Sequence, residues 1–168
     1  GLVTSYIAAA VRAKVTLIEG HKMGGDCLNY GCMPSKALIH SAAFLKQVKN
    51  SASLGIATAT VDYKFSDVMA RVQRVVSTVE PHDSVERYTK LGVEVLQGKA
   101  TITSPWSVEV NGQTLTTRAI VIATGARPAI PNIPGLETVR YYTSDTIWSL
   151  TERPEQLVVL GGGPIGCE

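Results

Sequence analysis

Two closely spaced cysteines are the residues of this chain best suited to chemistry. Cys27 and Cys32 lie in the segment G-G-D-C-L-N-Y-G-C-M-P-S-K, residues 24–36. A regular helix would separate their Cα atoms by about 7.5 Å along its axis, whereas a disulfide bond requires about 4.4–6.8 Å. The backbone must therefore leave the helical path between them, and Gly31, which has no Cβ, permits a tighter turn. The spacing predicts a redox dithiol.

The residues after Cys32 favour negative charge on its sulfur. Pro34 is suited to the first position of a helix, because its φ angle is already near the helical value. The N–H groups and the positive dipole end of a helix start stabilise a thiolate. Lys36 follows Cys32 by four residues, which puts both on one face if the helix covers them. We therefore expect Cys32 to carry charge more readily than Cys27.

Two other interpretations of the cysteine pair remain open. Half of a zinc site is one, but structural zinc sites usually need a second Cys or His pair at similar spacing. The remaining Cys167 and the three histidines form no such pair, so we expect no metal site. The other is that both cysteines are small buried apolar side chains, as unpaired cysteines often are.

Composition restricts the classes of protein to consider. Of the 168 residues, 45% are hydrophobic and 18% are charged, which is typical of an ordinary globular domain or slightly more. The net charge of +2 gives no reason to expect nucleic acid as a partner. No apolar run reaches the ~18 residues that a membrane span needs, and no signal peptide is recognisable. We expect a cytoplasmic protein, where a close cysteine pair is more often catalytic than structural.

The beginning of the chain has the pattern of a dinucleotide-binding βαβ unit. Gly1 precedes an apolar helix over residues 2–13, and a β-branched strand over residues 15–19 ends in Glu19. In such units an acidic residue that binds the ribose hydroxyls follows the glycine fingerprint by about 20 residues. We expect Gly1 to be the last glycine of a fingerprint whose first strand is lacking. Taken alone, Glu19 could equally be an ordinary carboxylate at a strand end.

Local patterns predict an α/β fold with a small antiparallel β insertion. Asn111-Gly112 is typical of a type I′ hairpin turn. The apolar run of residues 119–125 is typical of a strand that is buried on both faces, and prolines make residues 126–135 an extended connector. We expect the helix that starts at Pro34 to continue through residue 48, and a second helix over residues 66–79 to be capped by Ser66 and broken by Pro81. Strands over residues 93–102 with a bend at Gly98, and a hairpin over residues 108–115, would form the antiparallel insertion.

A second glycine fingerprint lies at the end of the sequence. An apolar strand is expected over residues 157–160, and Gly161, Gly163 and Gly166 follow at the G-x-G-x-x-G spacing. A strand followed by such a turn predicts a pyrophosphate-binding loop. We expect Cys167, which comes next, to be a small packing residue. The domain interpretation is a cofactor-binding domain over residues 1–150 and the start of a nucleotide-binding domain over residues 151–168.

These motifs together resemble one known family. Residues 27–36 resemble the C-L-N-x-G-C-x-P-S-K redox motif of the class I pyridine nucleotide–disulfide oxidoreductases, which are flavoproteins. Residues 123–125 are similar to the A-T-G turn of that family, and residues 159–166 to its NAD(P)H fingerprint. The sequences of residues 24–27, 80–87 and 142–145 are most similar to those of the mercuric reductase-like branch of the family. The fold implied is a partial FAD-binding Rossmann-like doubly wound unit.

The resemblance implies a role for each matching residue. FAD would have its ribose at Glu19, its pyrophosphate near Gly1, Gly24 and Gly25, and its adenine near Ala100. Ala123, Thr124 and Gly125 would pass close to FAD, and Gly161, Gly163 and Gly166 would bind NAD(P)H. Cys32 would be the sulfur in charge-transfer contact with the flavin, Cys27 the thiol that exchanges with substrate, and Lys36 a cation near the flavin. Asp26 departs from the family, in which Thr is common at this position.

The resemblance also implies a reaction and partners. Electrons would pass from NAD(P)H through FAD to the Cys27–Cys32 disulfide, and then to a small-molecule disulfide, a protein disulfide or a metal ion. Relatives complete the site with a His–Glu pair from a partner subunit, so we expect a homodimer. Nothing in residues 1–168 matches that pair, and we expect this chain alone to be inactive. The alternatives are a flavoprotein without a working dithiol and a nucleotide-binding module in which the cysteines only staple the fold.

Overall fold

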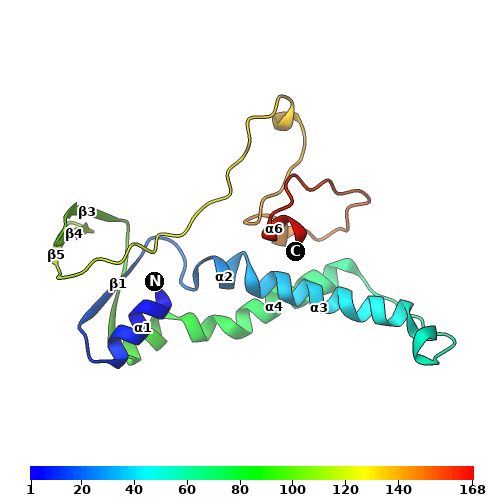
Figure 1. Cartoon of the computed structure of the whole chain (residues 1–168), viewed down its shortest axis with the longest axis horizontal. Helices are drawn as coiled ribbons and strands as arrows, with labels where there is room; N and C mark the ends of the chain where they lie inside the picture. Colours follow the sequence, from blue (N-terminus) through cyan, green and yellow to red (C-terminus); the bar gives the residue numbers. More distant parts are fainter. The chain divides into compact units, whose positions relative to one another are not determined.

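The computed structural model describes all residues of the chain, 1–168. They form two compact units. Figure 1 colours the chain by residue number, from the N-terminus to the C-terminus. Unit 1 comprises residues 1–25 and 79–126, and unit 2 comprises residues 26–78 and 127–168. Helices and strands both occur, and the strands form one parallel pair and one antiparallel sheet. The expectation of an α/β fold is therefore confirmed.

Unit 1 contains a parallel strand pair flanked by helices. Strand β1 (Val15–Glu19) pairs with β2 (Val93–Gln97) from the first residue of each to the last. Helix α1 (Leu2–Ala10) contacts both strands, and α5 (Val85–Lys90) contacts β2. The 3₁₀ segment η2 (Glu80–Asp83) precedes α5 in unit 1, and η1 (Ser51–Leu54) belongs to unit 2. The pairing brings two segments together that are distant in sequence, and their carboxyl ends lie at the same edge.

Tyr88 of α5 belongs to the small core of unit 1. Its side chain is 5% exposed and Val93 at the start of β2 is 2% exposed. Burial raises the pKa of Tyr88 above its ordinary value of 10.0, and the negative charge of Asp83 raises it further. The helix that carries Tyr88 begins at a capping residue, because the Ser84 hydroxyl accepts a hydrogen bond from the Arg87 backbone N–H.

The antiparallel insertion is present and has three strands. They are β3 (Ala100–Ser104), β4 (Ser107–Val110) and β5 (Gln113–Thr116), in that order across the sheet. Asn111 and Gly112 join β4 to β5 with φ angles of 51° and 76°, as a type I′ turn requires. The predicted hairpin is thus confirmed. The sequence interpretation of residues 93–97 as part of this insertion was wrong, because β2 pairs with β1 instead.

Two of the expected buried strands are absent from the structure. Residues 119–125 and 157–160 form no strand, and Val121, Ile122 and Val158 are exposed. A strand needs a neighbour that exchanges backbone hydrogen bonds with it, and the parallel sheet here consists of β1 and β2 only. An apolar run shows that a segment is suited to a sheet interior, but it does not supply the neighbouring strands.

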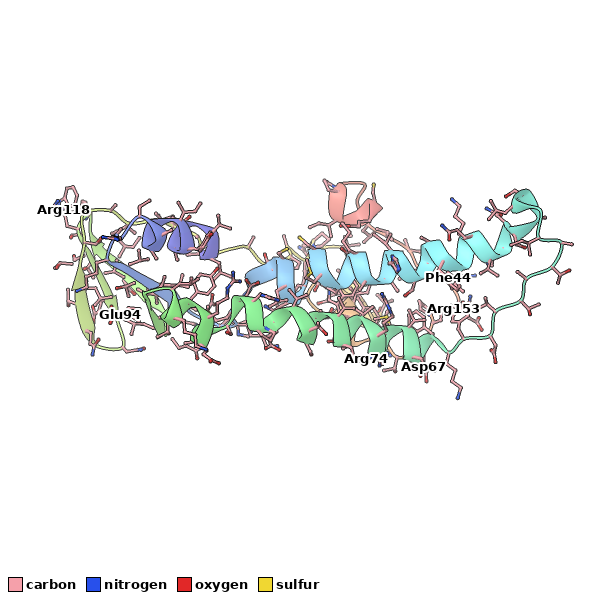
Figure 2. All side chains as sticks on the ribbon, turned by 90° about the horizontal axis from the view of Figure 1, so that it is seen from below. Phe44, Asp67, Arg74, Glu94, Arg118 and Arg153 are labelled. Atoms are coloured by element: carbon pink, nitrogen blue, oxygen red, sulfur yellow. The ribbon has the colours of Figure 1, made fainter.

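Unit 2 is dominated by two long helices that lie side by side (Figure 2). Helix α3 (Cys32–Lys49) follows the short α2 (Gly25–Asn29), and α4 (Phe65–Val79) returns along α3. The Arg71 guanidinium of α4 donates hydrogen bonds to the Ala37 carbonyl at 2.8 Å and to the Ser41 hydroxyl at 3.3 Å on α3. The smaller elements of this unit are η3 (Leu136–Thr138), η4 (Ile147–Ser149) and α6 (Pro164–Cys167).

Three local expectations for unit 2 were wrong in detail. Helix α3 begins at Cys32, two residues before Pro34, so that proline occupies the first turn rather than its first position. Helix α4 begins at Phe65, and Ser66 therefore lies inside the helix instead of capping it. Cys167 is exposed rather than packed, because the short helix α6 has no buried residue. Each of these differences concerns an element end, where local patterns are least decisive.

Candidate redox and cofactor site

The helix is interrupted between the two cysteines, as their spacing predicts. Cys27 lies in α2, Cys32 is the first residue of α3, and Tyr30 and Gly31 separate the two helices. The Asp26 carbonyl accepts hydrogen bonds from the N–H groups of Tyr30 at 2.9 Å and Gly31 at 2.6 Å. Both cysteines are exposed. The alternative in which they are small buried side chains is therefore wrong for this structure.

Gly31 is required by the close approach of the chain to itself. A Cβ at this position would lie 3.2 Å from the Asp26 carbonyl oxygen, the same atom that accepts both hydrogen bonds of the turn. This separation is tighter than ordinary packing, so any side chain would have to displace that carbonyl. The turn between the two sulfurs thus depends on the absence of a Cβ.

The first turns of α3, which carry Cys32, are fixed by burial and by hydrogen bonds. Pro34, Ser35 and Ala37 in its first turns are buried. The Ser35 N–H donates to the Gly31 carbonyl at 3.0 Å, and the Ser35 hydroxyl donates to the Cys32 carbonyl at 3.3 Å. No acidic residue lies in the first turn of this 18-residue helix. The positive end of the helix therefore faces the Cys32 position without an opposing carboxylate on the same turn.

Lys36 lies in α3 with Cys32, as expected, but its side chain has a partner of its own. Its ammonium group forms an ion pair with the Glu168 carboxylate, within unit 2. The Lys36 side chain is 63% exposed, and an ion pair at such a position adds little stability. Exchange of this partner for another anionic group is therefore energetically inexpensive.

Trp148 is a site residue that sequence reasoning missed. Its indole N–H donates a 2.8 Å hydrogen bond to the Tyr30 carbonyl, in the turn between the cysteines. The Gln73 side-chain amide in turn donates to the Trp148 carbonyl at 3.2 Å. Trp148 and Tyr30 are 118 positions apart, and no spacing rule connects residues at that distance. The sequence alone carries no signal for this contact.

Glu19 ends β1 at the edge where the parallel strands finish. Its carboxylate accepts a 2.8 Å hydrogen bond from the His21 N–H, which fixes the orientation of the group. The Glu19 carbonyl also accepts from the Gly98 N–H at 3.0 Å, and Gly98 is two residues before Ala100. The structure thus brings the predicted ribose residue near the segment that was predicted to meet adenine.

Gly1, Gly24 and Gly25, the three glycines predicted to lie near the pyrophosphate, all belong to unit 1. Gly24 and Gly25 have φ angles of 92° and 59°, in the left-handed region that favours glycine. A Cβ on Gly1 would lie 3.6 Å from the Ala123 Cβ, so these two predicted residues are neighbours. Thr124 and Gly125 follow Ala123 and are exposed. Asp26, the departure from the family motif, is also exposed.

A pocket of unit 1 lies beside the carboxyl ends of β1 and β2. Its volume is about 270 Å³. Its lining includes His21, Lys22 and Met23, which follow Glu19 after one intervening residue. The other lining residues are Glu80, Ser84, Val85 and Gln97. Ligands of open α/β sheets bind at this kind of edge, and residues 21–23 were not among the residues predicted from sequence.

The second glycine fingerprint forms a tight turn before α6. A Cβ on Gly166 would overlap the Gly161 carbonyl oxygen, and Gly161 has a φ angle of 111°. Gly163 precedes the helix, and its carbonyl accepts a 3.0 Å hydrogen bond from the Cys167 N–H. The structure therefore brings Gly161 and Gly166 together, while the strand expected before them does not form.

The chain has no cluster of three or more His, Cys, Asp or Glu side chains arranged to hold a metal ion. None of its helices combines the length and the apolar character that crossing a bilayer requires.

Comparison with known proteins gives a consistent result. A mercuric reductase of Bacillus cereus is 35% identical over 161 residues, which are 96% of this chain and 26% of that protein. A dihydrolipoyl dehydrogenase of Acholeplasma laidlawii is 35% identical over 173 residues, which cover 100% of this chain and 51% of the relative. The chain thus spans between about a quarter and a half of the length of these relatives.

A solved structure supports the same assignment for the fold. The HOCl-induced flavoprotein disulfide reductase RclA from Escherichia coli matches with a TM-score of 0.77 at 29% identity, over 98% of this chain and 35% of RclA. The elements described above therefore correspond to the FAD-binding Rossmann-like part of flavoprotein disulfide reductases. The family of pyridine nucleotide-disulphide oxidoreductases matches residues 1–168. This chain belongs to that family.

Proposed function

We propose that this chain is the FAD-binding and dithiol-bearing part of an NAD(P)H-dependent disulfide or metal-ion reductase. The observation that carries the proposal is the interrupted helix, which presents two exposed cysteines on either side of a turn and one of them at the start of α3. A buried staple would not need exposed sulfurs. An exposed pair at a helix start has the features of a reactive dithiol.

The residues at the edge of β1 and β2 fit FAD. The Glu19 carboxylate is an acceptor suited to ribose hydroxyls, and Gly24 and Gly25 would let a pyrophosphate approach the backbone closely. Gly1, Ala123, Thr124 and Gly125 would contact the same cofactor, with Ala100 near its adenine. When bound, FAD supplies the dithiol with two electrons that originate from NAD(P)H. Gly161, Gly163 and Gly166 would hold the nicotinamide nucleotide, and Lys36 would place positive charge near the flavin.

The cysteines perform the exchange with a disulfide substrate in two steps. The Cys27 thiolate attacks one sulfur of the substrate, the substrate S–S bond breaks, and the first product leaves as a thiolate. The Cys32 thiolate then attacks the Cys27 sulfur, the mixed disulfide breaks, and the second product leaves as a thiolate. The Cys27–Cys32 disulfide is restored, and both electrons have passed to the substrate.

The names of relatives support two classes of oxidised substrate. They include mercuric reductases and a glutathione reductase from Burkholderia cepacia. Thiolates are soft ligands, so one dithiol can serve either a disulfide or a soft metal ion. We therefore propose disulfides or thiophilic metal ions as the oxidised substrates.

The domain assignment and the assembly are also proposals. Residues 1–150 would form the FAD-binding domain and residues 151–168 the beginning of the NAD(P)H-binding domain. The whole protein would act as a homodimer in the cytoplasm. The expectation that residues 1–168 alone do not turn over stays a prediction.

The proposal is tested by three matched cysteine variants of the whole protein. NADH and NADPH oxidation is followed with oxidised glutathione, lipoamide or mercuric chloride as the oxidant. Cys27→Ser and Cys32→Ser should reduce the rate to background with every oxidant that the parent reduces. Cys167→Ser, the matched control, should keep the parental rate. A fully active Cys27→Ser variant would instead support a flavoprotein or nucleotide-binding module in which the pair is structural.

A further inference from the structure

The turn between the cysteines is held by a residue from a remote part of unit 2. Trp148 in η4 donates its indole N–H to the Tyr30 carbonyl at 2.8 Å. Its side chain is half-buried, so water competes only partly for this bond. The same turn is also held by the Asp26 carbonyl, which accepts from the N–H groups of Tyr30 and Gly31.

Trp148 is itself anchored to one of the long helices. The Gln73 side chain of α4 donates to the Trp148 carbonyl at 3.2 Å. Two hydrogen bonds therefore connect α4, through Trp148, to the turn between the cysteines. They link this turn to a helix other than α2 and α3.

We propose that Trp148 is a positioning residue for the dithiol, and that its hydrogen bond to Tyr30 raises the tendency of Cys27 and Cys32 to form a disulfide. The proposal rests on the proposed function, since it assumes that the pair is redox-active. Forming the disulfide requires both Cα atoms to be held within about 4.4–6.8 Å. The Gly31 N–H bond to the Asp26 carbonyl joins the residues that precede the two cysteines, and a Cβ on Gly31 would lie 3.8 Å from the Cys27 Cα, so the turn is closed. Holding it closed raises the effective concentration of one thiol at the other.

The chain contains a matched control residue. Trp106 is the other tryptophan, it is 62% exposed, and it belongs to unit 1, whereas the turn between the cysteines belongs to unit 2. Trp106→Phe and Trp148→Phe make the same chemical change and both keep an aromatic ring. Only the second removes a hydrogen bond to the dithiol turn.

The experiment measures the redox equilibrium of the pair in the whole protein carrying Cys167→Ser, so that no third cysteine of this segment interferes. Protein is equilibrated with mixtures of reduced and oxidised glutathione, quenched with acid and alkylated. Mass spectrometry of the peptide that contains Cys27 and Cys32 then gives the oxidised fraction. In this reaction the pair loses two electrons and two protons to glutathione disulfide, whose S–S bond breaks as the protein disulfide forms.

Trp148→Phe should lower the equilibrium constant for disulfide formation about three- to tenfold, the range expected for one lost hydrogen bond. Trp106→Phe should leave it unchanged. Gln73→Leu, a substitution at an exposed position of α4, should lower the same equilibrium constant by a smaller factor. If Trp148→Phe does not fold, an unchanged equilibrium constant in Gln73→Leu would refute the positioning role of Trp148.

The outcomes separate this inference from the proposed function. If the parent pair never oxidises across the glutathione mixtures, the proposed function fails. If the parent pair oxidises but Trp148→Phe folds and matches the parent, the positioning role of Trp148 is refuted. Equal shifts in Trp148→Phe and Trp106→Phe would also refute it, since the effect would then not depend on the bond to Tyr30.

Discussion

Replacing Gly31 with alanine should slow the closure of the dithiol. The added Cβ would lie 3.2 Å from the Asp26 carbonyl oxygen, and that oxygen must move by a few tenths of an ångström to relieve the contact. It accepts hydrogen bonds from both Tyr30 and Gly31, so the movement weakens both. If the weakening removes about half of two bonds worth ~0.5–1.5 kcal/mol each, the cost is about 1 kcal/mol, or roughly fivefold in rate.

The assay for Gly31→Ala follows one exchange step. Cys27 is converted to a mixed disulfide with glutathione, and the release of glutathione by Cys32 is measured over time. Gly162→Ala is the control, because no atom lies within 4 Å of a Cβ at that position. Circular dichroism checks that both variants fold. A parental release rate in Gly31→Ala, or equal slowing in Gly162→Ala, would refute the argument from the Asp26 contact.

The remaining predictions concern the cofactor edge, the core and the helix pair. Glu19→Gln should weaken FAD binding about tenfold through loss of a charge-assisted hydrogen bond, as measured by flavin fluorescence, and unchanged affinity would contradict the assigned role. Burial and the charge of Asp83 raise the pKa of Tyr88, so the folded state favours the neutral phenol. The contribution of this phenol to folding stability should be full below pH 10.0 and be lost as the pH rises through the pKa of the folded state. Ultraviolet titration should show a pKa above 10.0 for this phenol, and a pKa at or below 10.0 would contradict the burial argument. Arg71→Leu should lower the free energy of unfolding, measured in urea, by about 1–3 kcal/mol, because two hydrogen bonds to α3 are lost. Arg74→Leu on the same helix (labelled in Figure 2) should change the free energy of unfolding by less than ~0.5 kcal/mol. Equal effects of the two substitutions would exclude the interhelical hydrogen bonds as the cause.

The parts of the fold that sequence predicts well are those set by short-range geometry. The break between Cys27 and Cys32 follows from helix rise and disulfide reach, and it is present in the structure. The hairpin at Asn111 and Gly112 follows from two residues that accept positive φ angles. Neither prediction needs knowledge of a distant part of the chain.

The parts that sequence misses depend on partners far away in the chain. The apolar run of residues 119–125 is suited to a buried strand, but no neighbouring strand pairs with it. The parallel pairing of residues 15–19 with 93–97 is equally non-local, and sequence reasoning assigned the second segment to the wrong sheet. The contact of Trp148 with Tyr30 belongs to the same class. Such contacts are determined by packing of whole elements, which local periodicity does not describe.

We propose that the sulfurs of Cys27 and Cys32 cycle between disulfide and dithiol using electrons from a nicotinamide nucleotide. Alkylation of the oxidised, flavin-loaded protein before and after anaerobic addition of NADH or NADPH tests this cycle directly. Both cysteines should resist alkylation before the addition and become alkylated after it, with either nucleotide or both. The same alkylation pattern before and after both nucleotides, in a preparation whose flavin is fully reduced, would contradict the proposed cycle.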